Sequence, residues 1–173
     1  AARSRRLVKR ARRAAAMLLA LWHGAALADI HIDVTGVEGD VRRNVLAFLS
    51  VERYRERDDI DLDTMNRLFN RIDDEVRSAL RPFGYYEPQV QPELAQDGAD
   101  WRVRIRITPG SLVRITRVNI EVTGPGATEP EFTTLTEFPT LSAGMALNHG
   151  RYEQARAELV RTAAANGYLD ARL

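Results

Sequence analysis

The sequence predicts an α+β fold in which one small structural unit is present twice, the second time incompletely. Two observations predict the duplication. Residues 84–90 (GYYEPQV) recur in altered form as residues 167–173 (GYLDARL), and residues 30–36 (IHIDVTG) recur as residues 118–124 (VNIEVTG). The two matches are offset by 83 and 88 residues, so the repeated unit is of about that length. Tandem arrays of small modules usually function by binding along their length.

Three strands are predicted in the first unit, over 29–36, 89–96 and 101–108. The first and third alternate apolar and polar residues, and in the third strand the polar positions are Arg102, Arg104 and Arg106. This period of two is typical of a strand with one buried face. Pro92 indicates that the second strand lies at an edge of the sheet. Asp97-Gly98 predicts a hairpin turn between the second and third strands.

Two helices are predicted to cover one face of this sheet, near 40–50 and 64–81. The first places Val41, Val45, Phe48 and Leu49 on one side. The second repeats apolar residues three or four apart from Met65 to Leu80, with Asp63 or Thr64 as the expected N-cap. Pro82 should end this helix. The charged residues 52–61 between the helices predict a loop.

The second unit is predicted to repeat this order only in part. A strand is expected over 118–123, a weak helix over 129–137, and a clearer helix from the cap Asn148 to Asn166-Gly167. Another strand should begin near Leu169. Two closing strands are not present in the sequence, so we expect 111–173 to be an incomplete second domain after a first domain over 29–110.

The N-terminal residues have the pattern of a secretory signal peptide. Residues 1–13 carry seven basic and no acidic residues, and the apolar run 14–28 ends in Ala26-Leu27-Ala28. This pattern predicts cleavage between Ala28 and Asp29. The apolar run of fifteen residues is shorter than the ~20 residues that a helix needs to cross a bilayer. An uncleaved membrane anchor is the alternative interpretation.

Composition excludes several classes of function for the predicted mature chain. Removal of residues 1–28 leaves 18 arginines against 24 acidic residues, a net charge of −6, which argues against nucleic acid as a partner. The chain has no cysteine, so disulfides, thiolate catalysis and cysteine-ligated metals are excluded. His31 and His149 share no ligand spacing, and Asp73, Asp74 and Glu75 are interpreted as a solvated acidic helix face. We therefore predict a non-enzymatic protein without metal or cofactor.

Several short segments resemble the POTRA domain, the periplasmic module of outer-membrane assembly proteins of the Omp85 superfamily. The resemblance rests on a Val-Thr-Gly triplet after each first strand, a Gly-Tyr pair after each second helix, and the passage between the units; these are residues 34–36, 122–124, 84–86, 167–169 and 108–115. Residues 80–88 and 107–110 are most similar to the first domain of the TamA family, the outer-membrane subunits of the translocation and assembly module. Pro82 departs from that pattern and puts the end of the helix in doubt.

The resemblance implies tandem POTRA domains at the periplasmic face of the outer membrane, attached through a barrel that this chain lacks. It implies a non-enzymatic role in protein transport and membrane-protein assembly, including that of autotransporters. The implied partners are an inner-membrane-anchored, TamB-like periplasmic protein and unfolded outer-membrane protein clients. The alternative function is that of a POTRA-bearing inner-membrane division scaffold with an uncleaved N-terminal anchor.

The predicted binding surface is the backbone of the edge strand, because an extended partner segment can add to unpaired N–H and C=O groups by β-augmentation. Its residues are Val90, Gln91, Glu93, Leu94, Ala95 and Gln96. The stripe Arg102, Arg104 and Arg106 is a possible electrostatic face for anionic lipid headgroups or acidic client segments. Its favoured interpretation is a solvated sheet face, with Asp33 pairing one arginine. Tyr85, Tyr86 and Tyr168 are expected to pack in the core rather than to stack on a ligand.

Overall fold

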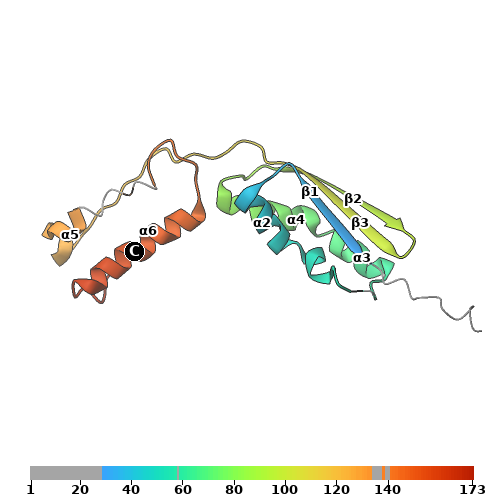
Figure 1. The fold of residues 1–173 in the computed structure, drawn as a ribbon. Helices are drawn as coiled ribbons and strands as arrows, with labels where there is room; N and C mark the ends of the chain where they lie inside the picture. Colours follow the sequence, from blue (N-terminus) through green and yellow to red (C-terminus); the bar gives the residue numbers. More distant parts are fainter. Residues whose placement is uncertain (1–28, 58, 134–137, 139–140) are drawn as a thin grey trace, which may run out of the picture.

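The computed structural model describes residues 29–57, 59–133, 138 and 141–173 (Figure 1). The predicted signal peptide lies outside these residues. A sheet covered by helices is followed by an extended segment and a long helix. The elements in chain order are β1 (Ile30–Thr35), α2 (Gly39–Phe48), a 3₁₀ helix (Ser50–Tyr54), α3 (Leu62–Phe69), α4 (Ile72–Leu80), a 3₁₀ turn (Arg81–Phe83), β2 (Gln89–Asp97), β3 (Asp100–Thr108), a 3₁₀ turn (Pro125–Thr128), α5 (Pro130–Thr133) and α6 (His149–Ala165).

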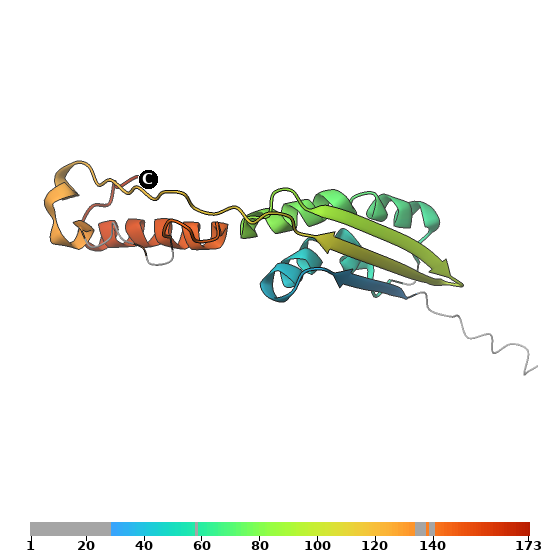
Figure 2. The ribbon, with the colours of Figure 1, turned by 90° about the horizontal axis from the view of Figure 1, so that it is seen from above.

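The three strands form one mixed sheet in the order β1-β3-β2, as Figure 2 shows from above. β1 runs parallel to β3, and β2 runs antiparallel to β3. β3 is therefore central, and β1 and β2 are the two edges. The strand bounds predicted from alternation agree with the observed ones to within about a residue.

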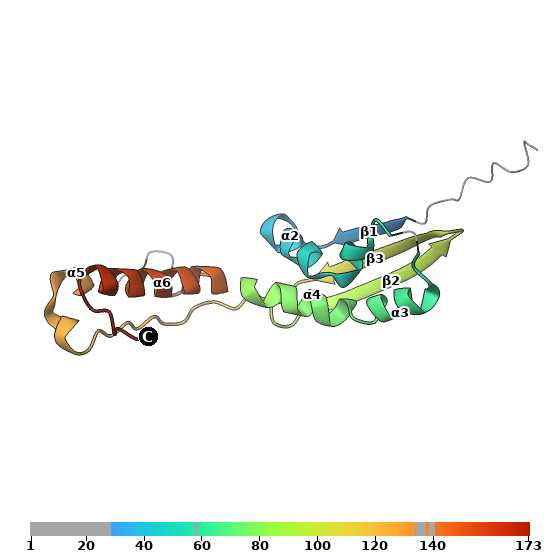
Figure 3. The same cartoon turned by 90° about the horizontal axis from the view of Figure 1, so that it is seen from below.

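The core lies between the sheet and the helices on one of its faces (Figure 3). Val34, Val76 and Ile105 come from a strand, a helix and another strand, and all three are buried in one cluster. The first unit therefore has the predicted α+β architecture, β-α-α-β-β with helices on one face. Within the described ranges, no helix combines the length and the apolar character that a membrane crossing requires.

The predicted helix over 64–81 is two helices, α3 and α4, separated by a turn at Asn70 and Arg71. Both turn residues keep right-handed helical dihedrals, and the Arg71 N–H donates to the carbonyl of Leu68, three residues back. The apolar face continues across the turn, so periodicity could not reveal the break. The N-cap is Asp61, whose carboxylate accepts from the N–H of Thr64 at 2.8 Å, and not Asp63 or Thr64 as predicted.

The segment predicted as a loop over 52–61 begins as a 3₁₀ helix, Ser50–Tyr54. This 3₁₀ helix extends to Tyr54, so the loop starts after Tyr54 and not at residue 52 as predicted. Phe48 also differs from the prediction, because its side chain is 43% exposed. Val45 and Leu49, from the same predicted face, are fully buried.

The passage between the two units is a small, hydrogen-bonded joint. The Val113 N–H donates to the Gly84 carbonyl at 2.9 Å, and the Leu147 N–H donates to the Val113 carbonyl at 2.9 Å. Gly84 has φ of +88°, and a Cβ atom there would lie 2.7 Å from the Leu147 carbonyl oxygen. Glycine is therefore required at residue 84 both for its left-handed backbone and for the close approach of the second unit.

The second unit confirms the predicted helix after Asn148, whose side chain accepts from the N–H of Arg151 at 3.0 Å. Helix α5 covers the beginning of the predicted helix over 129–137, and residues 134–137 lie outside the described residues. The predicted strands over 118–123 and from Leu169 are wrong, because both segments are irregular. A strand exists only when its backbone is paired, and no described residue pairs with these segments.

Candidate protein-binding edge of the sheet

The structure brings the six predicted binding residues together on β2, which is an edge strand of the sheet. β2 is nine residues long, and β1, the other edge, is six residues long. No described strand pairs with the outer side of β2. The prediction from Pro92 that this strand lies at an edge of the sheet is confirmed.

The direction of each β2 backbone group follows from the register. The Trp101 N–H donates to the Asp29 carbonyl at 2.8 Å, so the backbone N–H and C=O of Trp101 face β1. Gln96, the register partner of Trp101 on β2, therefore forms no backbone hydrogen bond with it. Because antiparallel pairs alternate between bonded and non-bonded, the outward-facing positions are every second residue from Gln96. These are Val90, Pro92, Leu94 and Gln96.

The hairpin turn supports the same assignment. Asp97 and Asp100 flank a two-residue loop whose first residue, Gly98, has φ of +65°. A positive φ at the first loop residue only is typical of a type II′ turn, in which the flanking residues form a bonded pair. Pro92, five residues before the pair member Asp97, therefore falls at an outward position, where its missing N–H breaks no bond of the sheet.

The other edge is partly blocked. In parallel pairing with β3, the backbone of Asp29 faces inward, so Ile30, Ile32 and Val34 face outward. The Arg42 side chain reaches from α2 and donates its Nε–H to the Val34 carbonyl at 3.4 Å. Helical periodicity places Arg42 outside the apolar face of α2 and does not reveal this contact. No sequence pattern indicates it, because the contact depends on how α2 packs beside β1.

The side chains of β2 alternate between the core and the open face of the sheet. Val90 and Leu94 are half-buried and pack against the core. Gln91, Glu93 and Ala95 are exposed on the opposite face. Two of the four residues with outward backbone groups, Val90 and Leu94, thus anchor the strand through their side chains, whereas Gln96 is exposed.

Arg102, Arg104 and Arg106 lie on the open face and are exposed. Arg104 lies in register between Asp33 on β1 and Glu93 on β2. Within the described chain, neither the Asp33 nor the Glu93 carboxylate lies within 4.0 Å of the Arg104 guanidinium. The predicted ion pair between Asp33 and an arginine of the stripe is therefore not formed. Arg102, from the same arginine stripe, forms an ion pair with Asp97, with 4.0 Å between a guanidinium nitrogen and a carboxylate oxygen.

A shallow groove of about 490 Å³ lies beside β1 at this face. It is lined by Asp29, Asp33, Arg55, Arg102 and Arg104, together with His31 and the neighbouring isoleucines. Both acidic and basic groups line it, and His31 Nε2 lies 3.7 Å from an oxygen of Asp29. The face therefore carries mixed charge, as expected for a solvated sheet surface.

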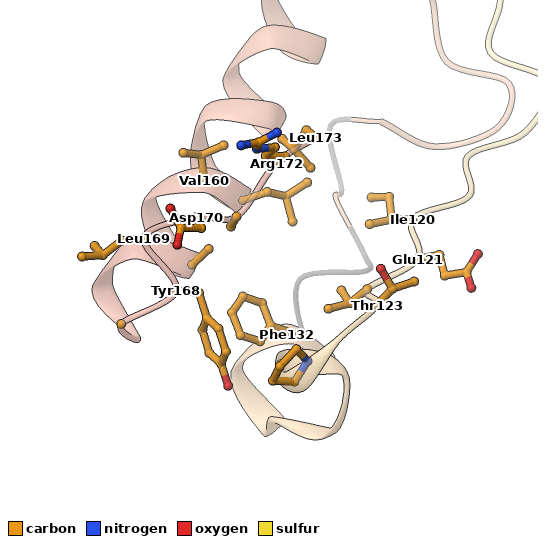
Figure 4. Close-up of a pocket in the computed structure, with 17 residues that line it drawn as sticks. Ile120, Glu121, Thr123, Phe132, Val160, Tyr168, Leu169, Asp170, Arg172 and Leu173 are labelled. Atoms are coloured by element: carbon orange, nitrogen blue, oxygen red, sulfur yellow. The ribbon is translucent and has the colours of Figure 1, made fainter.

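Of the three tyrosines predicted to pack in the core, only Tyr85 belongs to the core cluster, and Tyr168 is half-buried in the second unit. Tyr85 packs against the core of the first unit, and Tyr168 meets Phe132 edge to face with ring centroids 5.5 Å apart (Figure 4). Tyr86 is 39% exposed, so its predicted burial is wrong. Its hydroxyl lies 2.8 Å from Nε2 of His149, a contact between the two units. Tyr86 therefore lies at the joint between the two units and not in the core.

Of the acidic run on α4, only Glu75 departs from the predicted solvated face. Its side chain is 12% exposed, and its Oε2 accepts from the buried N–H of Ser50 at 2.8 Å.

Asp73 lies on the outer side of α4, and its hydrogen bond with Arg77 raises the pKa of Arg77. Hydrogen bonding from Thr64 likewise lowers the pKa of Asp61. No group of three or more potential metal ligands converges in the described ranges.

One comparison with known families bears on this geometry. Residues 31–109 match the family model described as "POTRA domain TamA domain 1". This match and the β-α-α-β-β order of the first unit are consistent with a POTRA fold over these residues. The match begins in β1 and ends just after β3, so it covers the whole sheet and the helices on it. The POTRA-type domain thus includes the β2 edge, the open arginine face and the core described above.

Proposed function

We propose that this protein is a periplasmic, non-enzymatic binding module of a TamA-like outer-membrane assembly factor, which docks partner or client strands on the outer edge of β2. The observation that carries the proposal is the set of outward β2 backbone groups within a POTRA-type domain. Val90, Leu94 and Gln96 offer N–H donors there, and Pro92 offers only its carbonyl. An extended guest strand would pair with these groups.

β2 is favoured over β1 for two reasons. It is longer, and its outward carbonyls are reached by no described side chain, whereas Arg42 already donates to the Val34 carbonyl of β1. An edge strand that is long, anchored and unprotected is available for pairing. Pro92 limits the pairing in the middle of β2 and so helps to prevent self-association.

The proposed partners are a TamB-like, inner-membrane-anchored periplasmic protein and unfolded outer-membrane protein clients. Export would follow cleavage between Ala28 and Asp29. N-terminal sequencing of the exported protein tests this part: a start at Asp29 supports the proposal. Retention of residues 1–28 would instead support the membrane-anchored division scaffold.

Two neighbouring proline substitutions test the edge. Gln96→Pro removes an outward donor, and Ala95→Pro removes a donor that faces Arg102 on β3. Both side chains are exposed, so neither substitution removes core packing. Gln96→Pro should weaken partner binding with little loss of thermal stability. Ala95→Pro should lower the stability by about 1–3 kcal/mol, because a sheet bond is lost and its acceptor is left unpaired.

Amide hydrogen exchange by NMR gives a second readout. Binding of the purified TamB-like partner should slow exchange at Val90, Leu94 and Gln96. Exchange at Glu93 and Ala95, which already face β3, should change little. Partner binding that leaves the three outward amides unprotected, or that survives Gln96→Pro and is lost in charge reversals at Arg104, would place the site on the arginine face instead.

A further inference from the structure

Asp29, the residue just before β1, is held against β3 by both of its backbone groups. Its carbonyl accepts from the Trp101 N–H at 2.8 Å, and its N–H donates to an oxygen of the Asp100 side chain at 3.0 Å. Trp101 is buried and Asp100 is half-buried, so these contacts place the Asp29 nitrogen beside the end of the core. Figure 2 shows that the start of β1 lies at the same end of the sheet as the hairpin between β2 and β3.

Three aspartates lie in one row across this end of the sheet, with Asp29 beside β1, Asp100 on β3 and Asp97 on β2. Asp97 and Asp100 are register partners. Asp29 precedes Ile30, whose register partner Trp101 follows Asp100. Side chains in one row project from the same face of a sheet, and like charges at such positions destabilise it. A cation within the row would therefore stabilise the sheet.

Two of these carboxylates have a basic neighbour. The Asp97 carboxylate lies 4.0 Å from a guanidinium nitrogen of Arg102. The Asp29 carboxylate lies 3.7 Å from Nε2 of His31. Among the residues that the structure describes, no basic side chain comes within 4.0 Å of the Asp100 carboxylate. Because the Asp29 N–H donates to this carboxylate, a positive charge on that nitrogen would neutralise the middle of the row.

The signal-peptide cleavage predicted between Ala28 and Asp29 would supply this charge. In the hydrolysis by a signal peptidase, the oxygen of one water bonds to the Ala28 carbonyl carbon and the C–N bond breaks. Both protons of that water pass to the nitrogen, which leaves a carboxylate on Ala28 and an α-ammonium group on Asp29. The nitrogen is already 3.0 Å from the Asp100 carboxylate. A hydrogen bond between two charged groups is roughly twice as strong as a neutral one.

We propose that the mature N-terminus locks the first unit: the α-ammonium group of Asp29 forms an ion pair with Asp100 and fixes the start of β1 against β3. Signal-peptide removal then completes the fold of this unit as well as releasing the chain. The inference rests on the export proposed above, because cleavage at this bond creates the ammonium group. It does not depend on strand docking at β2.

Three forms of the proposed mature chain, residues 29–173, test this N-terminal lock. The first has a free amine on Asp29, the second is acetylated there, and the third carries one extra alanine before Asp29. Acetylation restores an uncharged amide at the same nitrogen. The extra alanine moves the amine by about 3.8 Å along the chain. Trp101 is the one tryptophan left after residue 28, so its fluorescence reports the melting of this region.

At pH 7 the form with the free amine should have a Tm about 2–8 °C above that of the acetylated form. This is the range for an exposed ion pair in a domain of this size. The alanine-extended form should melt close to the acetylated form, because its amine lies too far from Asp100. Asp100→Asn keeps an oxygen acceptor without the charge, and in this variant the difference between the free and acetylated forms should fall below about 1 °C. Asp97→Asn, in the same row, is the matched control and should keep most of the difference.

The pH dependence has a defined sign. An α-amino group is protonated below about pH 8, and pairing with Asp100 holds the proton to higher pH. The extra stability of the free-amine form should therefore be complete below about pH 7 and disappear as the pH rises from about 8 to 10. The acetylated form is the reference at each pH, because it retains the other charged groups at this end of the sheet, which are the side chains of Asp29, His31, Arg55, Asp97, Asp100 and Arg102.

Different results would overturn different steps. Equal Tm values for the free and acetylated forms at pH 7 would refute the lock, even where N-terminal sequencing of the exported protein gives Asp29 as the first residue. A difference that persists in Asp100→Asn would refute Asp100 as the partner of the amine. An exported protein that starts at another residue would refute both the cleavage and the lock, and would leave the docking on β2 to its own test by amide exchange.

Discussion

Replacing Glu75 with alanine should destabilise the POTRA-type domain, although the residue belongs to an acidic run on a helix. The carboxylate accepts from the Ser50 N–H at 2.8 Å and lies 3.3 Å from Nε of Arg71. Ser50 is 2% exposed, so its N–H would be left without an acceptor and without water. A buried donor that loses its partner costs about 1–3 kcal/mol. For a domain of this size, each kcal/mol lowers Tm by about 4–8 °C.

Urea unfolding followed by circular dichroism measures the effect. Glu75→Gln keeps an oxygen acceptor and should lose less stability than Glu75→Ala. Asp74→Ala is the matched control, because Asp74 is exposed on the same helix and its removal should change the free energy of unfolding by less than about 0.5 kcal/mol. Equal midpoints for Glu75→Ala and Asp74→Ala would refute the assignment of Glu75 as the acceptor that holds the 3₁₀ helix.

Three further substitutions have defined outcomes. Gly84→Ala should disrupt the joint, because its Cβ would lie 2.7 Å from the Leu147 carbonyl oxygen, and the amide of Leu147 should then exchange faster. Ser50→Ala should leave the urea midpoint unchanged or raise it, because the buried hydroxyl has no partner in the described chain. Asp61→Ala should reduce stability at neutral pH. Since hydrogen bonding from the side chain and then the backbone of Thr64 lowers the Asp61 pKa, this difference in stability should hold above about pH 4 and vanish as the pH falls further.

The sheet could be predicted from the sequence because alternation is local information. Each strand of the first unit has either an apolar alternation with a period of two or a proline that indicates an edge. These features predict where the strand begins and ends and where it lies in the sheet. The turn between α3 and α4 could not be predicted. Asn70 and Arg71 stay close to helical geometry, so the apolar residues on either side keep the same phase.

The side chains that the sequence misplaced share a cause. Position within one element predicts a solvated side chain for Glu75 and a buried one for Tyr86, and it does not indicate the contact that Arg42 makes. Each is placed by a second element, respectively β1, the 3₁₀ helix after α2, and α6. Periodicity describes how an element is divided into faces, but not what packs beside each face. Such contacts depend on the assembled fold.

The two versions of the repeated segment show that a strand-like sequence forms a strand only where its backbone is paired. Residues 30–35 and 118–123 have nearly the same pattern, yet only the first forms a strand. In the first unit β3 pairs with residues 30–35, whereas no described residue pairs with residues 118–123. A strand is a property of a pair and not of one segment, so an apolar alternation alone does not determine whether a strand forms. The same reasoning carries the proposed docking site, because the outward backbone groups of β2 belong to a formed strand whose outer side has no described partner.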